Sequence, residues 1–165
     1  MLNKTLKYSL LLATAALSST AFAESTVSVG YAYSKIEDVK LKGVSAQYRY
    51  EWDSPVSVVV SASHLKGDEK WNTGHADVKY TSLLAGPAYR FNDMVSVYGV
   101  AGFAKSTIDE REYNSRYEIS KTSFAYGVGV EVNPVSNLSV HLGYEGTKVG
   151  EAKAKGFNIG VGYRF

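Results

Sequence analysis

The 165-residue sequence predicts an all-β fold, an eight-stranded antiparallel up-and-down transmembrane β-barrel of the outer-membrane type. Three features carry this prediction: strict alternation in residues 156–165, eight alternating segments along the chain, and connections that are short and long in turn. In residues 156–165 large apolar side chains occupy one face, and Asn158, Gly160, Gly162 and Arg164 occupy the other. A soluble strand would leave these glycines facing water, whereas a small barrel puts large side chains in lipid and small or polar ones in its crowded interior.

The amino terminus has the features of a secretory signal peptide. Lys4 and Lys7 provide a positive start, residues 9–17 form an apolar run too short to span a bilayer comfortably, and residues 21–23 provide a small-x-small cleavage site. We therefore expect residues 1–23 to be removed and residues 24–165 to form one barrel domain. Loss of the two lysines lowers the formal charge from +2 to 0, which predicts no nucleic-acid partner. The absence of cysteine excludes a disulfide framework and a thiolate site.

Eight segments alternate between large apolar and small or polar residues, as strands that face lipid on one side do. They are residues 26–34, 43–52, 56–65, 80–91, 95–105, 122–132, 138–147 and 156–165. The fifth segment has apolar residues on both faces, and we expect Val97, Ala101 and Phe103 to point outward. Pro87 lies inside the fourth segment, where we expect a local irregularity because proline cannot donate to a strand ladder.

The connections between these segments are of two kinds. Residues 53–55, 92–94 and 133–137 are short and rich in turn formers, whereas residues 35–42, 66–79, 106–121 and 148–155 are longer and charged. This alternation is typical of periplasmic turns and extracellular loops. Outward aromatic residues cluster at the turn-proximal ends of the segments and predict an interfacial girdle of Tyr50, Trp52, Tyr89, Phe91, Tyr163 and Phe165.

Six charged residues fall on the inward faces of five different segments. They are Arg49, Glu51, Arg90, Glu131, Glu145 and Arg164, three cations and three anions. The lumen of an eight-stranded barrel is only wide enough for side chains to fill, and buried charges persist only when they are paired. The pattern therefore favours a structural ion network over a catalytic cluster or an ion pathway.

Residues that suggest enzyme chemistry do not form a convincing site in the sequence. Ser139, His141 and Glu145 are all inward residues of one segment, but same-face neighbours on a strand stand about 6.5 to 7 Å apart, beyond hydrogen-bond reach. His64 and His75 lie at or in the second long connection, where solvation is the commoner role than metal binding. The sequence has no nucleotide or zinc motif, so we expect no enzyme activity, no cofactor and no metal.

Several stretches resemble the Ail/Lom (OmpX-like) family of enterobacterial outer-membrane proteins. These stretches are residues 85–93 (AGPAYRFND), residues 123–130 (SFAYGVGV), Asn133-Pro134 and residues 160–165 (GVGYRF). The resemblance implies a monomeric eight-stranded barrel in a family that includes adhesion, invasion and complement-resistance factors, and relatives without an assigned role. It also implies that Tyr163 and Phe165 form a signal for the outer-membrane insertion machinery.

The long connections hold the residues that would contact a partner. Exposed cationic and aromatic residues of adhesive relatives contact matrix proteins or heparin-like polymers, and the candidates in this chain are Lys40, Lys42, Lys66, Lys70, Trp71, Arg111 and Arg116. Solvated loop charges without a ligand are the alternative for each of these residues. The sequence therefore leaves three hypotheses: a surface protein that binds host matrix or complement proteins, a structural or envelope-stress barrel, and, less favoured, a lipid-modifying enzyme. Outer-membrane lipid and lipopolysaccharide are expected partners in each case.

Overall fold

The structure is a computed structural model that describes residues 24–36, 39–71, 74–112, 115–149 and 151–165. For residues 69–71, 74–75, 111–112, 116–117, 149 and 152 it describes the backbone alone. The predicted signal peptide, residues 1–23, lies outside the described residues. No helix in the described part of the chain is long and apolar enough to cross a membrane.

Eight antiparallel strands form the described chain. They are β1 (Glu24–Ile36), β2 (Val39–Glu51), β3 (Val56–Trp71), β4 (Gly74–Arg90), β5 (Val95–Glu112), β6 (Ser115–Val135), β7 (Leu138–Val149) and β8 (Ala152–Arg164). Each strand pairs with the next, and β8 pairs with β1, so the sheet closes on itself. The predicted eight-stranded up-and-down barrel is confirmed.

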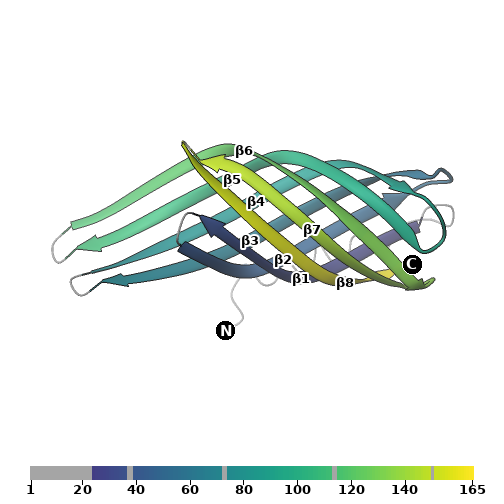
Figure 1. The fold of residues 1–165 in the computed structure, drawn as a ribbon, viewed down its shortest axis with the longest axis horizontal. Coiled ribbons are helices and arrows are strands. Elements are labelled where there is room, and N and C mark those ends of the chain that lie inside the picture. Colours follow the sequence, from purple (N-terminus) through teal and green to yellow (C-terminus); the bar gives the residue numbers. More distant parts are fainter. Residues whose placement is uncertain (1–23, 37–38, 72–73, 113–114, 150) are drawn as a thin grey trace, which may run out of the picture.

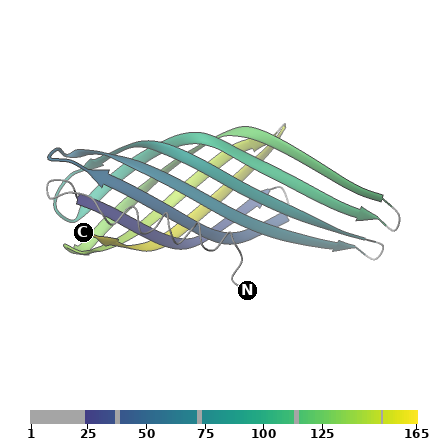
Figure 2. The same ribbon diagram turned by 180° about the vertical axis from the view of Figure 1, so that it is seen from behind.

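The two ends of the barrel differ in shape (Figures 1 and 2). The turn end holds the connections at residues 52–55, 91–94 and 136–137, together with the start of β1 and the end of β8. At the opposite end, the loop end, the β3–β4 and β5–β6 hairpins project beyond the rest of the barrel. Residues 115–124 of β6 pair with β5, while pairing with β7 starts at Ala125. We call this projecting part, residues 67–71, 74–78, 106–112 and 115–124, the protruding sheet.

The protruding sheet corrects the predicted extent of two long connections. Residues 66–79 and 106–121 were expected to be loops, but most of them are strand. Beyond the membrane the backbone hydrogen bonds between the strands continue, because backbone groups still need partners. Lipid no longer covers the outer face there, so an apolar residue is no longer required at every second position. Asp68 and Lys79, for example, occupy exposed positions where alternation in the bilayer would require apolar side chains.

The faces of the strands follow the predicted inside and outside pattern. Phe103 and Ala101 are exposed and Tyr98 is buried, which is the register expected for the fifth segment. The ladder between β4 and β5 has no paired residues at Gly86 and Pro87, so the proline lies at an irregular position, as expected. Three outward aromatic pairs contact each other near the turn end, Tyr50 with Trp52, Tyr89 with Phe91, and Tyr163 with Phe165.

The interior has two layers. Towards the loop end it is mainly apolar, with buried Leu41, Leu65, Tyr80 and Leu84 packed in one cluster. Towards the turn end it is charged, as described below. Between and around these layers many inward positions are serine, glycine or alanine, because the lumen of a narrow barrel has little room for larger side chains.

Candidate functional site

A charged cluster fills the interior near the turn end, and Arg49 and Glu131 are its most buried members. The Arg49 side chain is 1% exposed and that of Glu131 is 0% exposed. Arg49 Nη1 donates to Glu131 Oε1 at 3.0 Å, and Arg49 Nε donates to Ser57 Oγ at 2.9 Å. The contacts join β2, β3 and β6 across the lumen. The pair is therefore fully removed from water and held by hydrogen bonds as well as by charge.

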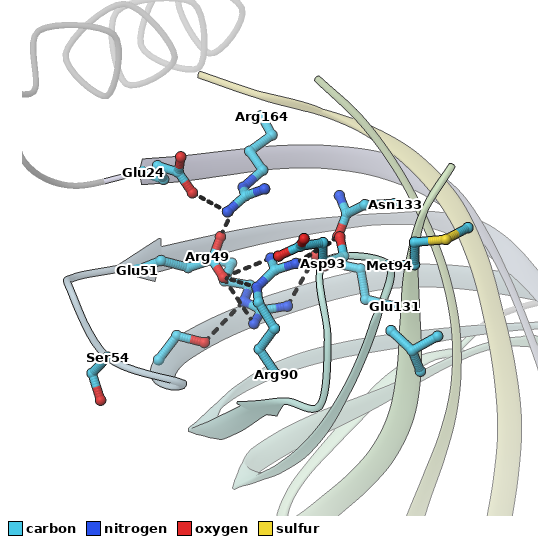
Figure 3. Close-up of polar contacts among 12 residues, drawn as sticks. Glu24, Arg49, Glu51, Ser54, Arg90, Asp93, Met94, Glu131, Asn133 and Arg164 are labelled. Carbon is cyan, nitrogen blue, oxygen red and sulfur yellow. Dashed lines mark hydrogen bonds and ion pairs between the residues drawn. The ribbon is translucent and has the colours of Figure 1, made fainter. Parts of the chain in front are cut away.

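Glu51 is the anion that three arginines share (Figure 3). Arg90 donates to Glu51 Oε1 from Nη2 at 2.7 Å and from Nε at 3.0 Å, and Arg49 Nη2 lies 3.0 Å from the same oxygen. Arg164 Nε donates to Glu51 Oε2 at 3.1 Å, and its Nη2 pairs with Glu24. The cluster thus holds three cations and the three anions Glu24, Glu51 and Glu131, and it is neutral as a whole.

The structure does not bring Glu145 into this cluster, which corrects one member of the predicted network. Glu145 Oε1 accepts a hydrogen bond from Tyr80 Oη at 2.6 Å, in the layer towards the loop end. On β7 it is four residues beyond His141, the residue that pairs with Glu131, and four residues span about 13 Å of strand. Alternation predicts the face of the strand on which a residue lies but not its position along the barrel axis. The prediction therefore grouped inward residues that lie at different levels of the lumen.

Glu24 takes the place of Glu145 as the third anion, and the sequence reasoning missed it. The first predicted segment began at residue 26, whereas β1 begins at Glu24. Thr26 and Ser28 are buried inward residues, so extending the same alternation two positions back would have placed Glu24 inward as well. Figure 3 shows Arg164 between Glu24 and Glu51 at the turn-end mouth of the lumen.

Ser139 and His141, the residues that suggested enzyme chemistry in the sequence, lie inside the barrel. Ser139 and His141 are 0% and 1% exposed, so no external molecule reaches them in this arrangement. In the described ranges no group of three or more His, Asp or Glu side chains could hold a metal ion. The cluster can pair charges and tie strands together, which are structural tasks.

A second charged feature lies on the outside of the barrel, at the loop end. Of the predicted contact residues, Lys40, Lys42 and Lys66 are exposed, and the side chains of Lys70, Trp71, Arg111 and Arg116 lie outside the described part of the structure. Strand register places further lysines directly beside the three that are described. Lys40 is opposite Lys35, which is opposite Lys155, and Lys42 is opposite Lys66, which is opposite Lys79.

These six outward lysines form a continuous band over β8, β1, β2, β3 and β4, which we call the lysine stripe: Lys155, Lys35, Lys40, Lys42, Lys66 and Lys79. All six are exposed. They point outward because they alternate with buried inward residues such as Ser34, Leu41, Leu65 and Tyr80. Neighbouring strands lie about 4.8 Å apart, so each row of three lysines spans only about 10 Å.

In the part of the chain that the structure describes, the lysine stripe has few anionic partners. Among the described residues, the only ion pair of the stripe joins Lys79 Nζ to Asp109 Oδ2 at 3.3 Å. Like charges placed directly opposite each other on neighbouring strands destabilise a sheet. Three of these lysines, Lys35, Lys79 and Lys155, were missed by the sequence reasoning. The signal was that three predicted long connections, residues 35–42, 66–79 and 148–155, begin and end with lysine.

Comparison with known proteins gives the family. A model of the outer membrane protein β-barrel domain family matches residues 8–165. The virulence membrane protein PagC of Salmonella typhimurium is 43% identical over 157 residues, 84% of this chain and 85% of that protein. The attachment invasion locus protein of Yersinia enterocolitica is 36% identical and covers 99% of this chain and 100% of that protein. The chain belongs to the Ail/OmpX family of outer-membrane proteins.

Solved structures of this family support the same conclusion. The crystal structure of Yersinia pestis Ail in complex with the heparin analogue sucrose octasulfate superposes with a TM-score of 0.82 at 33% identity, and covers 88% of this chain and 100% of that one. The protein is thus a multi-pass outer-membrane barrel. Names in this part of the Ail/OmpX family describe attachment, invasion and virulence rather than catalysis.

Proposed function

We propose that this protein is a surface attachment barrel whose lysine stripe binds sulfated polyanions of a host matrix. The proposal is carried by the strand register, which aligns six exposed lysines in two adjoining rows. Among the described residues, one of these lysines, Lys79, forms an ion pair within the protein. A row of ammonium groups on flexible stems attracts a sulfated chain without requiring one fixed geometry. The heparin analogue bound to Yersinia pestis Ail supports this ligand class.

The experiment measures heparin affinity of the barrel in uncharged phosphatidylcholine vesicles. Replacing Lys35, Lys40 and Lys155 by glutamine removes one row of the stripe. At about 1 kcal/mol per lysine near a polyanion, affinity should fall on the order of 100-fold, and the loss should shrink as salt rises.

The matched control removes the same charge from Lys105, Lys121 and Lys148, which are exposed but lie outside the stripe. Its heparin affinity should change by a few-fold at most. Equal losses in the two triple variants would mean that net charge alone attracts heparin, and unchanged affinity in the stripe variant would overturn the proposal.

The protruding sheet offers a second surface for attachment, suited to a protein partner. One edge of β6 over residues 115–124 has no strand paired to it on the β7 side in the described register. A free strand edge presents backbone donors and acceptors that an extended peptide can pair with. Deleting residues 109–112 and 115–118 together shortens both strands equally. Adhesion of cells expressing this variant to host-matrix proteins should fall while heparin affinity is kept, and undiminished adhesion would exclude the sheet as a contact.

A chiefly structural or envelope-stress role is the second candidate function. The neutral ion cluster at the turn end favours it, because those contacts stabilise a barrel whether or not a ligand binds. The two functions differ in one measurement: a structural barrel leaves adhesion unchanged when the lysine stripe and the protruding sheet are altered. A lipid-modifying activity is disfavoured because Ser139 and His141 are fully enclosed, and assay on lipopolysaccharide tests it directly.

We propose that Tyr163, in β8, and Phe165, directly after it, are recognised by the outer-membrane insertion machinery. Their rings stack with centroids 6.2 Å apart. Phe165→Ala should lower the fraction of heat-modifiable, folded protein in membranes, and unchanged insertion would contradict the assignment. Mass spectrometry of the membrane-inserted protein tests the expected cleavage after Ala23.

A further inference from the structure

An open pocket lies at the turn end of the barrel, against the charged cluster. It has a volume of about 410 Å³, and small-molecule sites in proteins span roughly 300 to 1,000 Å³. Its charged lining consists of Glu24, Glu51, Asp53, Arg90, Asp93 and Arg164. The short turns of outer-membrane barrels face the periplasm, so this pocket, which we call the turn-end pocket, opens towards the periplasm.

Two aspartates supply the free anions of the turn-end pocket. Asp53 lies in the connection after β2 and Asp93 in the connection after β4, and both are exposed. In the part of the chain that the structure describes, neither aspartate forms an ion pair. Glu24 and Glu51, by contrast, pair with arginines. The two aspartates are therefore the carboxylates that a cation from the periplasm can reach.

Two arginines supply donors to the same pocket. Arg164 donates from Nε to Glu51 Oε2 at 3.1 Å, and its Nη2 pairs with Glu24. Arg90 donates from Nε and Nη2 to Glu51 Oε1, while its Nη1 has long contacts, the shorter at 3.3 Å to the backbone oxygen of Asp93. These contacts use Nε and Nη2 of both arginines. Nη1 of each arginine is thus the donor that a ligand can engage.

Glu51 fixes the orientation of both guanidinium groups. Its side chain is 7% exposed, and Arg90 and Arg164 reach it from different strands, at 2.7 Å and 3.1 Å. Figure 3 shows the two arginines converging on this carboxylate. Donors that are already held in place lose little conformational freedom when a ligand binds. The two arginines are therefore preorganised for a carboxylate, the anion that a guanidinium group binds most specifically together with phosphate.

A ligand that satisfies both kinds of group carries an ammonium and a carboxylate close together. The ammonium pairs with Asp53 or Asp93, and the carboxylate accepts from Nη1 of the arginines. A simple cation or a simple anion would leave one set of groups without a partner. Peptides of the bacterial cell wall, which lies in the periplasm, end in such a group where they are not cross-linked, because diaminopimelic acid has an ammonium and a carboxylate on one terminal carbon.

We propose that the turn-end pocket binds the diaminopimelate end of cell-wall peptides and so holds the outer membrane against the wall. The pocket volume of about 410 Å³ suits the end of one peptide rather than a folded protein domain. A ligand with one charge of each sign also leaves the neutral cluster neutral. The inference goes beyond the proposed attachment function, which uses the opposite end of the barrel, and neither depends on the other.

The first test compares two peptides on the wild-type protein, so it does not depend on the folding of a variant. One is N-acetylated alanyl-γ-glutamyl-diaminopimelate, and the other has lysine in place of diaminopimelate, which keeps the ammonium but lacks the terminal carboxylate. Calorimetry measures their affinity for the barrel in phosphatidylcholine nanodiscs. The lysine peptide should bind on the order of tenfold more weakly, because the contact with the arginines is lost. Equal affinity, or no binding of the diaminopimelate peptide, would overturn the proposal.

The second test removes the anions of the pocket. Asp53→Asn with Asp93→Asn keeps the shape of two exposed side chains and should weaken binding of the diaminopimelate peptide on the order of tenfold. The matched control, Glu110→Gln with Glu118→Gln, removes two exposed charges from the protruding sheet and should bind as the wild type does. Equal losses in the two variants would mean that overall charge attracts the peptide. That result, or unchanged affinity in the aspartate variant, would overturn the proposal.

A competition experiment separates the ligand class from simple cations. Cadaverine has two ammonium groups and no carboxylate, so it should compete poorly with the diaminopimelate peptide. Equal competition would assign the pocket to cations in general and overturn the proposal. Heparin affinity of the aspartate variant should equal that of the wild type, so failure of this inference differs from failure of the attachment proposal, which concerns the lysine variants.

Discussion

The charged residues at the two ends of the barrel differ in direction and in pairing. At the turn end the clustered charges are arginines and glutamates that point inward, lie near each other and are neutralised. At the loop end the lysines of the lysine stripe point outward, lie beside other lysines and have one ion pair in the described part of the molecule. Arginine holds a carboxylate with a rigid planar fork, whereas lysine is a flexible point charge. The difference separates a region whose contacts stabilise the barrel from the region that we propose binds a host partner.

The largest expected effect is on the buried pair at the turn end. Arg49→Ala leaves Glu131 without its cation at a site that is 0% exposed, and should lower the free energy of unfolding by about 3 to 5 kcal/mol. Urea unfolding in lipid vesicles measures this, with Glu110→Ala, an exposed charge of the protruding sheet, as the near-neutral control.

Replacing both Arg49 and Glu131 distinguishes the cost of an unpaired charge from the cost of lost side-chain packing. The double variant Arg49→Met with Glu131→Leu leaves no unpaired charge in this pair and should recover much of the lost stability. If Arg49→Ala is as stable as the wild type, the interior charges do not stabilise the barrel, and the contrast between the two ends is lost.

A smaller effect compares two inward glutamates at different depths. Glu131→Gln disturbs the ion pair with Arg49 and should destabilise the barrel by about 1 to 3 kcal/mol. Glu145→Gln replaces a carboxylate that accepts from Tyr80 and has no cation paired to it in the described residues. It should change the unfolding free energy by less than about 1 kcal/mol. Equal losses in the two variants, measured by urea unfolding, would mean that Glu145 has an ionic partner after all.

The effect on stability should change sign at the loop end. Glutamine at Lys35, Lys40 and Lys155 removes directly opposed like charges, and each such pair costs about 0.2 to 1 kcal/mol. We therefore expect the unfolding free energy to rise slightly, by up to about 1 kcal/mol, in the same variant that loses heparin affinity. Added salt should reduce the gain by screening the repulsion. A clear loss of stability would show that the stripe has a structural role.

The smallest effect is expected in a conductance measurement. Arg49, Glu51 and Glu131 meet across the lumen, and an eight-stranded barrel has no room for a water channel beside them. The protein in a planar bilayer should therefore show no large, steady single-channel current. Such a current would mean that the charged cluster opens, whereas brief small currents are compatible with a closed barrel.

Sequence reasoning was most successful where the chain crosses the membrane. Lipid on one side and a narrow lumen on the other require large and small residues in alternation, so the inward face of Asn158 and of Gly160 could be predicted from spacing alone. The extent of β5 and β6 could not be predicted, because lipid no longer covers the outer face of the protruding sheet and the requirement for alternation ends there. Residues 106–121 were therefore expected to form a loop, although most of them are strand.

The charged sites could not be predicted in full from alternation, because alternation does not give the position along the barrel axis or the register between strands. Glu145 and Glu131 both point inward, but the ladder pairing shows that they lie at different depths, and Glu24 rather than Glu145 reaches Arg164. The lysine stripe depends on register between strands distant in sequence, such as Lys35 with Lys155. Repeated lysines at the ends of predicted loops were visible in the sequence, but only pairing shows that they form rows.

Barrel closure gives the charged cluster a role in the order of folding. The ladder between β1 and β8 joins Thr26 to Arg164, residues separated by almost the whole described chain. Contacts between such distant residues are costly in chain entropy, so this seam forms late. The Arg164 side chain on β8 pairs with Glu24 on β1 and with Glu51 on β2, and these ion pairs stabilise the pairing of β8 with β1. The ion pairs that stabilise the folded barrel thus include those of Arg164, which hold β8 against β1 and β2 once the barrel has closed.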